Sequence, residues 1–176
     1  MIKEFVERKI ILREYQHQVH KYPLIFDRYA KVLILGTFPS VRSRALGFYY
    51  GHPQNRFWKV LAHLTNESIP QTIQEKKALL LKHHIAIGDV IKSCDIIGSS
   101  DSSIKNVVPM DISIILEHCQ IEQIYANGQT AAKLYQKYLQ PKIQKEIITL
   151  PSTSPANATY SLEKLIESWQ QIQSFL

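Results

Sequence analysis

The sequence of 176 residues lacks the features that mark several large classes of protein. It has two cysteines, Cys94 and Cys119, and no CxxC pair, so the cysteines alone can build neither a zinc site nor an iron–sulfur cluster. No apolar run approaches the roughly 20 residues that a membrane-spanning helix needs. The phosphate-binding patterns GxxxxGK(S/T) and GxGxxG and the nucleophile motif GxSxG are also missing. These absences argue against a metal cluster, a membrane span, a P-loop enzyme, a dinucleotide-binding fold and an α/β hydrolase.

The histidines do not make up for the missing metal motifs. His17 and His20 are three residues apart, and His83 and His84 are adjacent, but no acidic residue stands at ligand spacing to either pair. We therefore expect no metal site, and we expect both cysteines to be buried free thiols.

The composition is that of an ordinary globular protein, with 45% hydrophobic and 20% charged residues. A chain of this length fits a single domain, and we expect one domain over residues 1–176. The N-terminal segment MIKEFVERKI lacks the apolar core of a secretory signal, which predicts a cytoplasmic protein, and we expect a monomer with no membrane contact. The net charge of +6 favours anionic partners, because a basic surface attracts phosphate groups.

Short apolar segments alternate with helical patterns along the chain, which predicts a parallel sheet covered by helices on both faces. The expected strands are residues 32–35, 85–87, 123–126 and 146–150. Apolar residues recur at helical spacing after Phe57, after Ala131 and after Leu162. A further helix is expected over residues 3–20, as an N-terminal extension of the domain.

A polar, unusual stretch follows each expected strand: GTFPS at 36–40, GDVIKSC at 88–94, NGQ at 127–129 and PSTSPAN at 151–157. The carboxyl ends of parallel strands lie along one edge of the sheet, where open α/β folds bind their ligands. The segment GFYYGHPQN (47–55) enters the same edge. The sequence therefore predicts one site assembled from five loops.

Each of these stretches has a structural and a functional interpretation. GTFPS is a turn leaving a strand, or a loop whose backbone amides face an anion or a base edge. PSTSPAN caps the last helix through Thr159 or Asn157, or contacts a nucleic-acid backbone through its hydroxyl groups. Asp89 caps a helix, or its carboxylate makes polar contacts in the site. Asn55 is the N-cap of the helix that begins near Phe57, or projects into the site to hold a water or a base edge. These last two roles compete for one side-chain oxygen.

Five motifs in this order resemble the uracil-DNA glycosylase superfamily, and within it the branch of hypoxanthine-DNA (deoxyinosine) glycosylases. They are GTFPS, GFYYGHPQNRFWKVL, GDVIKSC with SSDSSIKN, ANGQTAA and LPSTSPANA. The segment HPQNRFW also resembles the mismatch-specific uracil-DNA glycosylases. The resemblance runs from about Tyr22 to the C-terminus and leaves the first 21 residues outside it.

The resemblance implies a three-layer α/β/α sandwich with a central four-stranded parallel sheet, which acts on DNA without metal or cofactor. It implies extrusion of a deaminated nucleotide and hydrolysis of the bond between base and deoxyribose. By position, Tyr50 resembles the aromatic residue that stacks on the extruded base, and Asn55 resembles the catalytic asparagine, whose carbonyl would orient the attacking water. Pro155 and Ala156 stand where relatives carry the wedge that fills the vacated stack.

The remaining site residues are expected from the same motifs. The resemblance implies that the base is bound by Gly36, Thr37, Phe38, Pro39, Asp89 and Ser152, and that DNA phosphates are bound by Ser40, Lys92, Ser154 and Asn157. Two positions depart from the superfamily pattern: Phe38 replaces a water-handling asparagine, and Ser152 stands where a histidine or asparagine is usual. Both departures fit the hypoxanthine branch.

The leading hypothesis is a monofunctional glycosylase of base-excision repair that releases hypoxanthine, with uracil as a second candidate base, from double-stranded or single-stranded DNA. No lysine in these motifs is placed as a Schiff-base nucleophile, so we predict no strand cleavage. The alternatives are a uracil- or thymine-mismatch glycosylase, a DNA-binding protein of this fold without turnover, and a module that binds small nucleotides.

Overall fold

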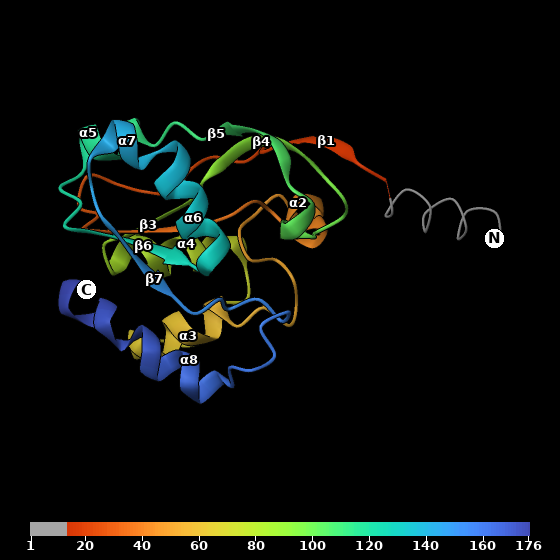
Figure 1. The fold of residues 1–176 in the computed structure, drawn as a ribbon. Helices are drawn as coiled ribbons and strands as arrows, with labels where there is room; N and C mark the ends of the chain where they lie inside the picture. Colours follow the sequence, from red (N-terminus) through yellow and green to blue (C-terminus); the bar gives the residue numbers. More distant parts are fainter. Residues whose placement is uncertain (1–13) are drawn as a thin grey trace.

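The computed structural model describes residues 14–176, and its centre is a four-stranded parallel sheet (Figure 1). β2 (Val32–Gly36) lies between β3 (Ile85–Asp89) and β6 (Gln123–Asn127), and β7 (Ile147–Leu150) pairs with the other side of β6. These are the four segments expected from the apolar runs, so the predicted parallel sheet is confirmed.

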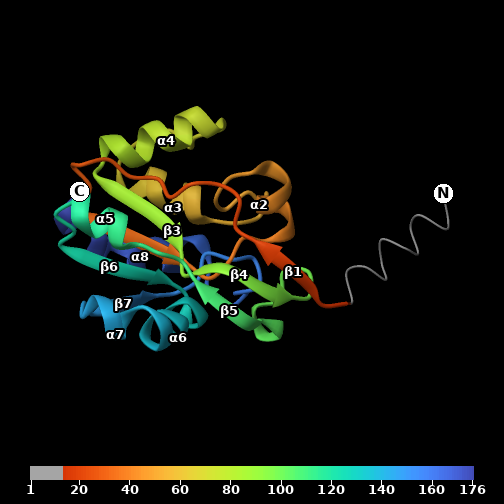
Figure 2. The ribbon, with the colours of Figure 1, turned by 90° about the horizontal axis from the view of Figure 1, so that it is seen from above.

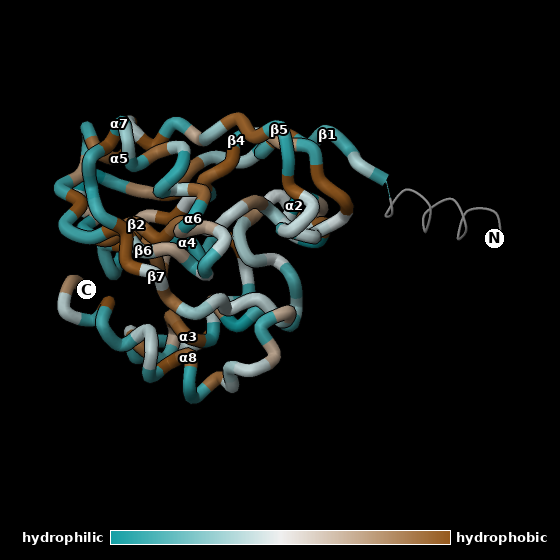
Figure 3. The backbone as a smooth tube through the Cα atoms, in the orientation of Figure 1, coloured by the Kyte–Doolittle hydropathy of each residue, from teal (hydrophilic) through white to brown (hydrophobic). Residues whose placement is uncertain are grey.

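Helices cover both faces of this sheet, as predicted. α3 (Phe57–Leu64), α4 (Ile73–Lys82) and α8 (Leu162–Trp169) pack on the face that carries Val32 and Ile34. α5 (Ser113–His118), α6 (Gln129–Tyr138) and α7 (Gln140–Ile143) lie on the opposite face, with Leu33 and Leu35. Successive residues of a strand point to opposite faces, so the run VLIL supplies both cores. Figure 3 shows hydrophobic segments at β2 and at α3, which packs on the sheet.

A second, antiparallel sheet was not predicted. It consists of β1 (Gln16–Val19), β4 (Ile91–Ile96) and β5 (Lys105–Pro109), with β4 in the middle. The expected helix over residues 3–20 is therefore wrong for 16–19, and its residues 3–13 lie outside the described part. The segment GDVIKSC, expected as a loop, contains the start of β4. The pairing of β1 with residues 93–96 joins segments far apart in sequence, which no local pattern reveals.

The small sheet lies beside the carboxyl ends of the parallel strands, because β4 begins two residues after β3 ends (Figure 2). The connections near this edge contain α2 (Val41–Leu46) and a short 3-10 helix, η1 (Asp101–Ser103). The chain ends in a second 3-10 helix, η2 (Gln170–Phe175). The N-cap of α8 is Ser161, and neither Asn157 nor Thr159 takes that role.

Both cysteines are buried free thiols, as expected. Within residues 14–176, no helix combines the length and the hydrophobicity needed to cross a membrane.

Candidate active site

A cavity of about 950 Å³ opens at the carboxyl edge of the parallel sheet. Residues from every loop singled out in the sequence contribute to its walls. All the expected site residues except Lys92 line it: Gly36, Thr37, Phe38, Pro39, Ser40, Tyr50, Asn55, Asp89, Ser152, Ser154 and Asn157. The structure therefore brings together in one place residues that lie up to about 120 positions apart in the chain.

Lys92 does not line the cavity. It lies exposed on β4, and its ammonium group donates to the backbone carbonyl of His20 at 3.3 Å. The expectation of Lys92 as a phosphate ligand rested on its position in the GDVIKSC motif. Because this segment is a strand, alternate side chains point away from the cavity.

The closest approach in the cavity wall occurs at Gly36, the last residue of β2. A Cβ atom on this residue would lie 2.4 Å from Asp89 Oδ1 and 3.1 Å from the Tyr50 hydroxyl. No other residue type fits here without displacing one of the two groups. The glycine therefore lets the carboxylate of Asp89 and the ring of Tyr50 meet at the sheet edge.

Tyr50 is held with its backbone in the left-handed region, at φ 53°, and its ring stacks on Phe57 with centroids 3.8 Å apart. Its hydroxyl group is buried and has no hydrogen-bond partner among residues 14–176. Burial, reinforced by the charge of Asp89, raises the pKa of Tyr50 far above its ordinary value, so the hydroxyl stays a neutral donor. A rigid aromatic ring in a cavity wall suits stacking against a planar ligand.

The carboxamide of Asn55 faces both the helix and the cavity. Its Oδ1 accepts from the backbone N–H of Phe57 at 3.0 Å and from the Thr153 hydroxyl at 2.9 Å. Because a backbone N–H can only donate, the atom facing it is the oxygen. Both lone pairs of the oxygen are thus used within the protein, so its expected role in orienting water stays a prediction that requires one of these hydrogen bonds to be exchanged for the water. The Nδ2 group has no partner among the described residues and is the part of Asn55 left for a ligand.

A buried hydrogen-bonded chain sets the orientation of this carboxamide. Asn127, the last residue of β6, accepts from the Thr153 backbone N–H and donates to the Thr153 hydroxyl, both at 2.9 Å. That hydroxyl in turn donates a hydrogen bond to Asn55 Oδ1. Thr153 is fully buried and Asn127 is 8% exposed. From the sequence, these residues were recognised only as parts of NGQ and PSTSPAN. Asn127 directly follows the expected strand 123–126, and a polar residue at that position was the signal that could have found it.

Arg56 was also missed. Its guanidinium group donates to the backbone carbonyls of Ser154 at 2.6 Å, Asn157 at 3.0 Å and Thr153 at 3.3 Å, and to that of Tyr160. Figure 1 shows the loop before α3 and the loop before α8 running side by side at this point. A guanidinium group carries several N–H donors in a fixed plane, so it can donate hydrogen bonds to several carbonyls at once. Arg56 therefore holds the PSTSPAN loop in its shape.

The side chains of the PSTSPAN loop are largely used inside the loop. Ser152 Oγ accepts from the backbone N–H of Ser154, Ser154 Oγ accepts from that of Ala156, and Asn157 donates to the carbonyl of Ser152 at 2.9 Å. These contacts stiffen the loop and leave Pro155 and Ala156 exposed at its tip.

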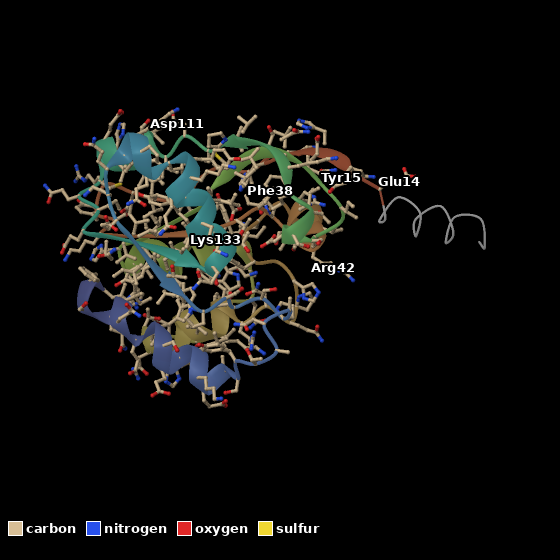
Figure 4. All side chains as sticks on the ribbon, in the orientation of Figure 1. Glu14, Tyr15, Phe38, Arg42, Asp111 and Lys133 are labelled. Atoms are coloured by element: carbon tan, nitrogen blue, oxygen red, sulfur yellow. The ribbon has the colours of Figure 1, made fainter. Side chains whose placement is uncertain are left out.

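Arg44, on α2, holds two other loops of the cavity wall together. It donates to the carbonyl of Pro39 at 2.6 Å and to that of Gly98 at 3.1 Å, which ties GTFPS to the GSSDSS segment. Ser40 caps α2 by accepting from the backbone N–H of Ser43. Phe38, labelled in Figure 4, lies in the interior against Ile91, so it supplies a wall and no water-handling group.

A second carboxyl group of the cavity wall, that of Asp101 in η1, has a perturbed acidity. Loss of water around the group, together with the charge of Asp89, raises the pKa of Asp101 to about 6. Its charge therefore changes within the range in which enzymes are commonly assayed. Across residues 14–176, no three histidine, cysteine or acidic side chains gather as a metal site would require.

A parallel α/β sheet with an aromatic and amide-lined cavity at its carboxyl edge defines an enzyme or binding protein for a small planar group. The family model of the uracil DNA glycosylase superfamily matches residues 24–173. The chain belongs to this superfamily.

Individual relatives agree with the family match. The chain is 34% identical, over 86% of its own length and 95% of the relative's, to a hypoxanthine DNA glycosylase of Methanosarcina acetivorans. It is 28% identical to a hypoxanthine DNA glycosylase of Methanosarcina barkeri, over 85% of this chain and 94% of that one. The solution NMR structure of a candidate uracil DNA glycosylase from Methanosarcina acetivorans superposes with a TM-score of 0.74 at 31% identity, covering 86% and 94% of the two chains.

Proposed function

We propose that this protein is a DNA glycosylase of base-excision repair that hydrolyses the N-glycosidic bond of hypoxanthine in DNA. The observation that carries the proposal is the cavity at the sheet edge, with the ring of Tyr50 and the free Nδ2 of Asn55 in its wall. The two Methanosarcina relatives named as hypoxanthine DNA glycosylases support the choice of base.

A base inside a duplex must leave the stack to reach such a cavity, and mispaired bases leave at the lowest cost. The extruded base would lie against Tyr50, whose ring is backed by Phe57. The exposed tip of the PSTSPAN loop, Pro155 and Ala156, would occupy the space that the base leaves in the duplex. Ser40, Ser154 and Asn157 at the cavity wall are proposed to position the flanking phosphates.

Cleavage of the N-glycosidic bond leaves positive charge on the sugar and negative charge on the departing base. Asn55 Nδ2 is proposed to donate a hydrogen bond to the departing base, where charge develops, because its oxygen is already bonded. The water oxygen bonds to the anomeric carbon, one of its protons is released, and the base takes up a proton. The chain Asn127–Thr153–Asn55 holds the donor in place before the reaction, which lowers the cost of reorganisation.

We further propose that the protein works as a cytoplasmic monomer on double-stranded or single-stranded DNA.

The direct test is excision from a panel of labelled oligonucleotides that contain hypoxanthine, uracil or a thymine mismatch, with abasic sites revealed by alkali. We expect abasic product from hypoxanthine under single-turnover conditions, and no strand break before alkali. Product from uracil or thymine alone would favour a mismatch glycosylase. DNA binding without product from any base would favour the non-catalytic alternative.

A further inference from the structure

The N-terminal strand β1 and the residues that follow it precede the part of the chain matched by the family model, which begins at residue 24. β1 pairs with β4 in antiparallel register, and the backbone N–H of His20 continues this pairing to the carbonyl of Lys92 at 2.8 Å. The pairing carries the chain to the wall of the cavity. Tyr22, two residues further on, lines the cavity.

His20 is 2% exposed and its Nε2 lies 3.0 Å from Asp89 Oδ2. Its ring is enclosed by aromatic side chains, with ring centroids 4.3 Å away for Tyr22 and 5.5 Å away for Tyr49. Asp89 is itself 4% exposed, and a buried carboxylate needs a donor to offset its lost hydration. His20 supplies that donor and fixes the rotation of the carboxylate.

The fixed rotation leaves the second oxygen of Asp89 for a ligand. Oδ1 has no hydrogen-bond partner among residues 14–176 and stands beside Gly36, at the point where a side chain is excluded. The hydroxyl groups of Tyr22 and Tyr50 line the same cavity, are buried and have no partner in the described chain. An unpaired buried hydroxyl is costly, so this end of the cavity presents one acceptor and two donors that call for a polar planar ligand.

We propose that Tyr22 reads the hydrogen-bonding edge of the extruded base beside Asp89, for which the resemblance already implies base binding, and that His20 is the positioning residue that aims Asp89; this inference rests on the proposed function. A deaminated base presents a ring N–H next to a carbonyl, which pairs with the Asp89 acceptor and a tyrosine hydroxyl donor. Adenine presents a bare ring nitrogen next to an amino group at the same place. Its nitrogen would face the Asp89 oxygen, and two acceptors in a dry cavity repel each other.

The first test is Tyr22→Phe, which removes one hydroxyl and keeps the ring. We expect single-turnover excision of hypoxanthine to fall about tenfold, as the loss of one hydrogen bond to the base predicts. The dissociation constant for a duplex carrying an abasic site should stay within about twofold of wild type, because that ligand has no base to read. Tyr29→Phe is the matched control, since Tyr29 is 55% exposed and lies outside the cavity lining, and it should change neither value.

The second test compares His20→Gln with His20→Leu. Glutamine keeps a side-chain donor for Asp89, whereas leucine leaves the carboxylate unpaired. We expect excision to fall at least tenfold in the leucine variant and the glutamine variant to recover most of that loss, with abasic-site affinity preserved in both. If the leucine variant does not fold, Tyr22→Phe still decides the proposal.

Three results would overturn this inference: wild-type excision by Tyr22→Phe, wild-type excision by His20→Leu, or a parallel loss of excision and abasic-site binding in both, which would mark a purely structural segment. Absence of hypoxanthine release by the wild-type protein is a different outcome, and it would overturn the proposed function itself.

Discussion

The hydroxyl of Thr153 donates to Asn55 Oδ1 at 2.9 Å, across 98 residues of sequence. The same oxygen accepts from the backbone N–H of Phe57, the first residue of α3, whose N-cap position is Arg56, so Asn55 both supports the start of the helix and lines a cavity. The two roles that the sequence sets in competition are met by different atoms of one carboxamide. The oxygen is held by the protein, and the Nδ2 group is left for the ligand.

Thr153→Val should lower the single-turnover rate of hypoxanthine excision about tenfold, because the isosteric side chain leaves Asn55 and Asn127 without their shared partner. Thr153→Ser keeps the hydroxyl and should stay within about threefold of wild type. Rates on the same labelled duplex check both variants. Equal rates for valine and threonine would show that the chain of hydrogen bonds does not position Asn55.

Asn55→Asp separates the two uses of the side chain. The aspartate keeps an acceptor for Phe57 and Thr153 but has no N–H to offer the base, so excision should fall at least about 100-fold. Its melting temperature should stay near that of wild type. Asn55→Ala should lose activity and also about 1 kcal/mol of stability, because the helix start loses its acceptor. Rates and thermal melts measured together distinguish these patterns, and an active aspartate variant would remove Nδ2 from the mechanism.

Arg56→Lys should destabilise the protein by about 2–4 kcal/mol, because a single ammonium cannot replace the fork of donors that reaches Ser154, Asn157 and Tyr160. Proteolysis should then cut within residues 151–160 sooner than in wild type. Urea denaturation and limited proteolysis measure the two effects. Lys59→Arg is a suitable control, since Lys59 is an exposed residue of α3. An unchanged denaturation midpoint for Arg56→Lys would contradict the proposed hold on the loop.

Asp101→Asn should raise thermal stability at pH 7.5 and have little effect below pH 4. The folded protein raises the pKa of Asp101 to about 6 from an ordinary value of 3.8, so it binds the proton more tightly than the unfolded chain does. Stability contributed by this group is therefore lost as pH rises from about 4 to about 6. The gain in the variant should be modest, about 1–2 °C, because Asp101 as a residue lies exposed at the surface, where solvent screens its charge although the carboxyl group itself is poorly hydrated. Melts across this pH range are the measurement, and a variant with the wild-type profile would contradict the perturbed acidity.

Local patterns were sufficient for the main sheet and for the position of the cavity. The run VLIL at 32–35 is apolar at every position, which is typical of a strand buried on both faces, and the polar stretches after the strands were bound to meet at one edge. The antiparallel sheet was not accessible in this way. β1 is four residues long, and only pairing with β4 makes it a strand.

In the site, too, some residues could be recognised from the local sequence and others only from their contacts in the folded chain. Asn55 and Tyr50 stood out because asparagine and paired tyrosines before a helix are unusual. Arg56 was given no role from the sequence, and its guanidinium group bonds four backbone carbonyls of a distant loop. Lys92 had the right charge in the right motif and faces away from the cavity.

By itself, the sequence determined the four parallel strands, the helices that begin near Phe57, Ala131 and Leu162, the sheet edge that carries the cavity and the residue types that reach it, because hydrophobic periodicity and strand direction are local properties. Tertiary structure alone decided which atom of Asn55 is free, that Asp89 is aimed by His20, and that Arg56 shapes the loop before α8. The reason is that a side chain's available donors and acceptors are those its neighbours leave unpaired, and those neighbours come from segments that only the folded chain brings together.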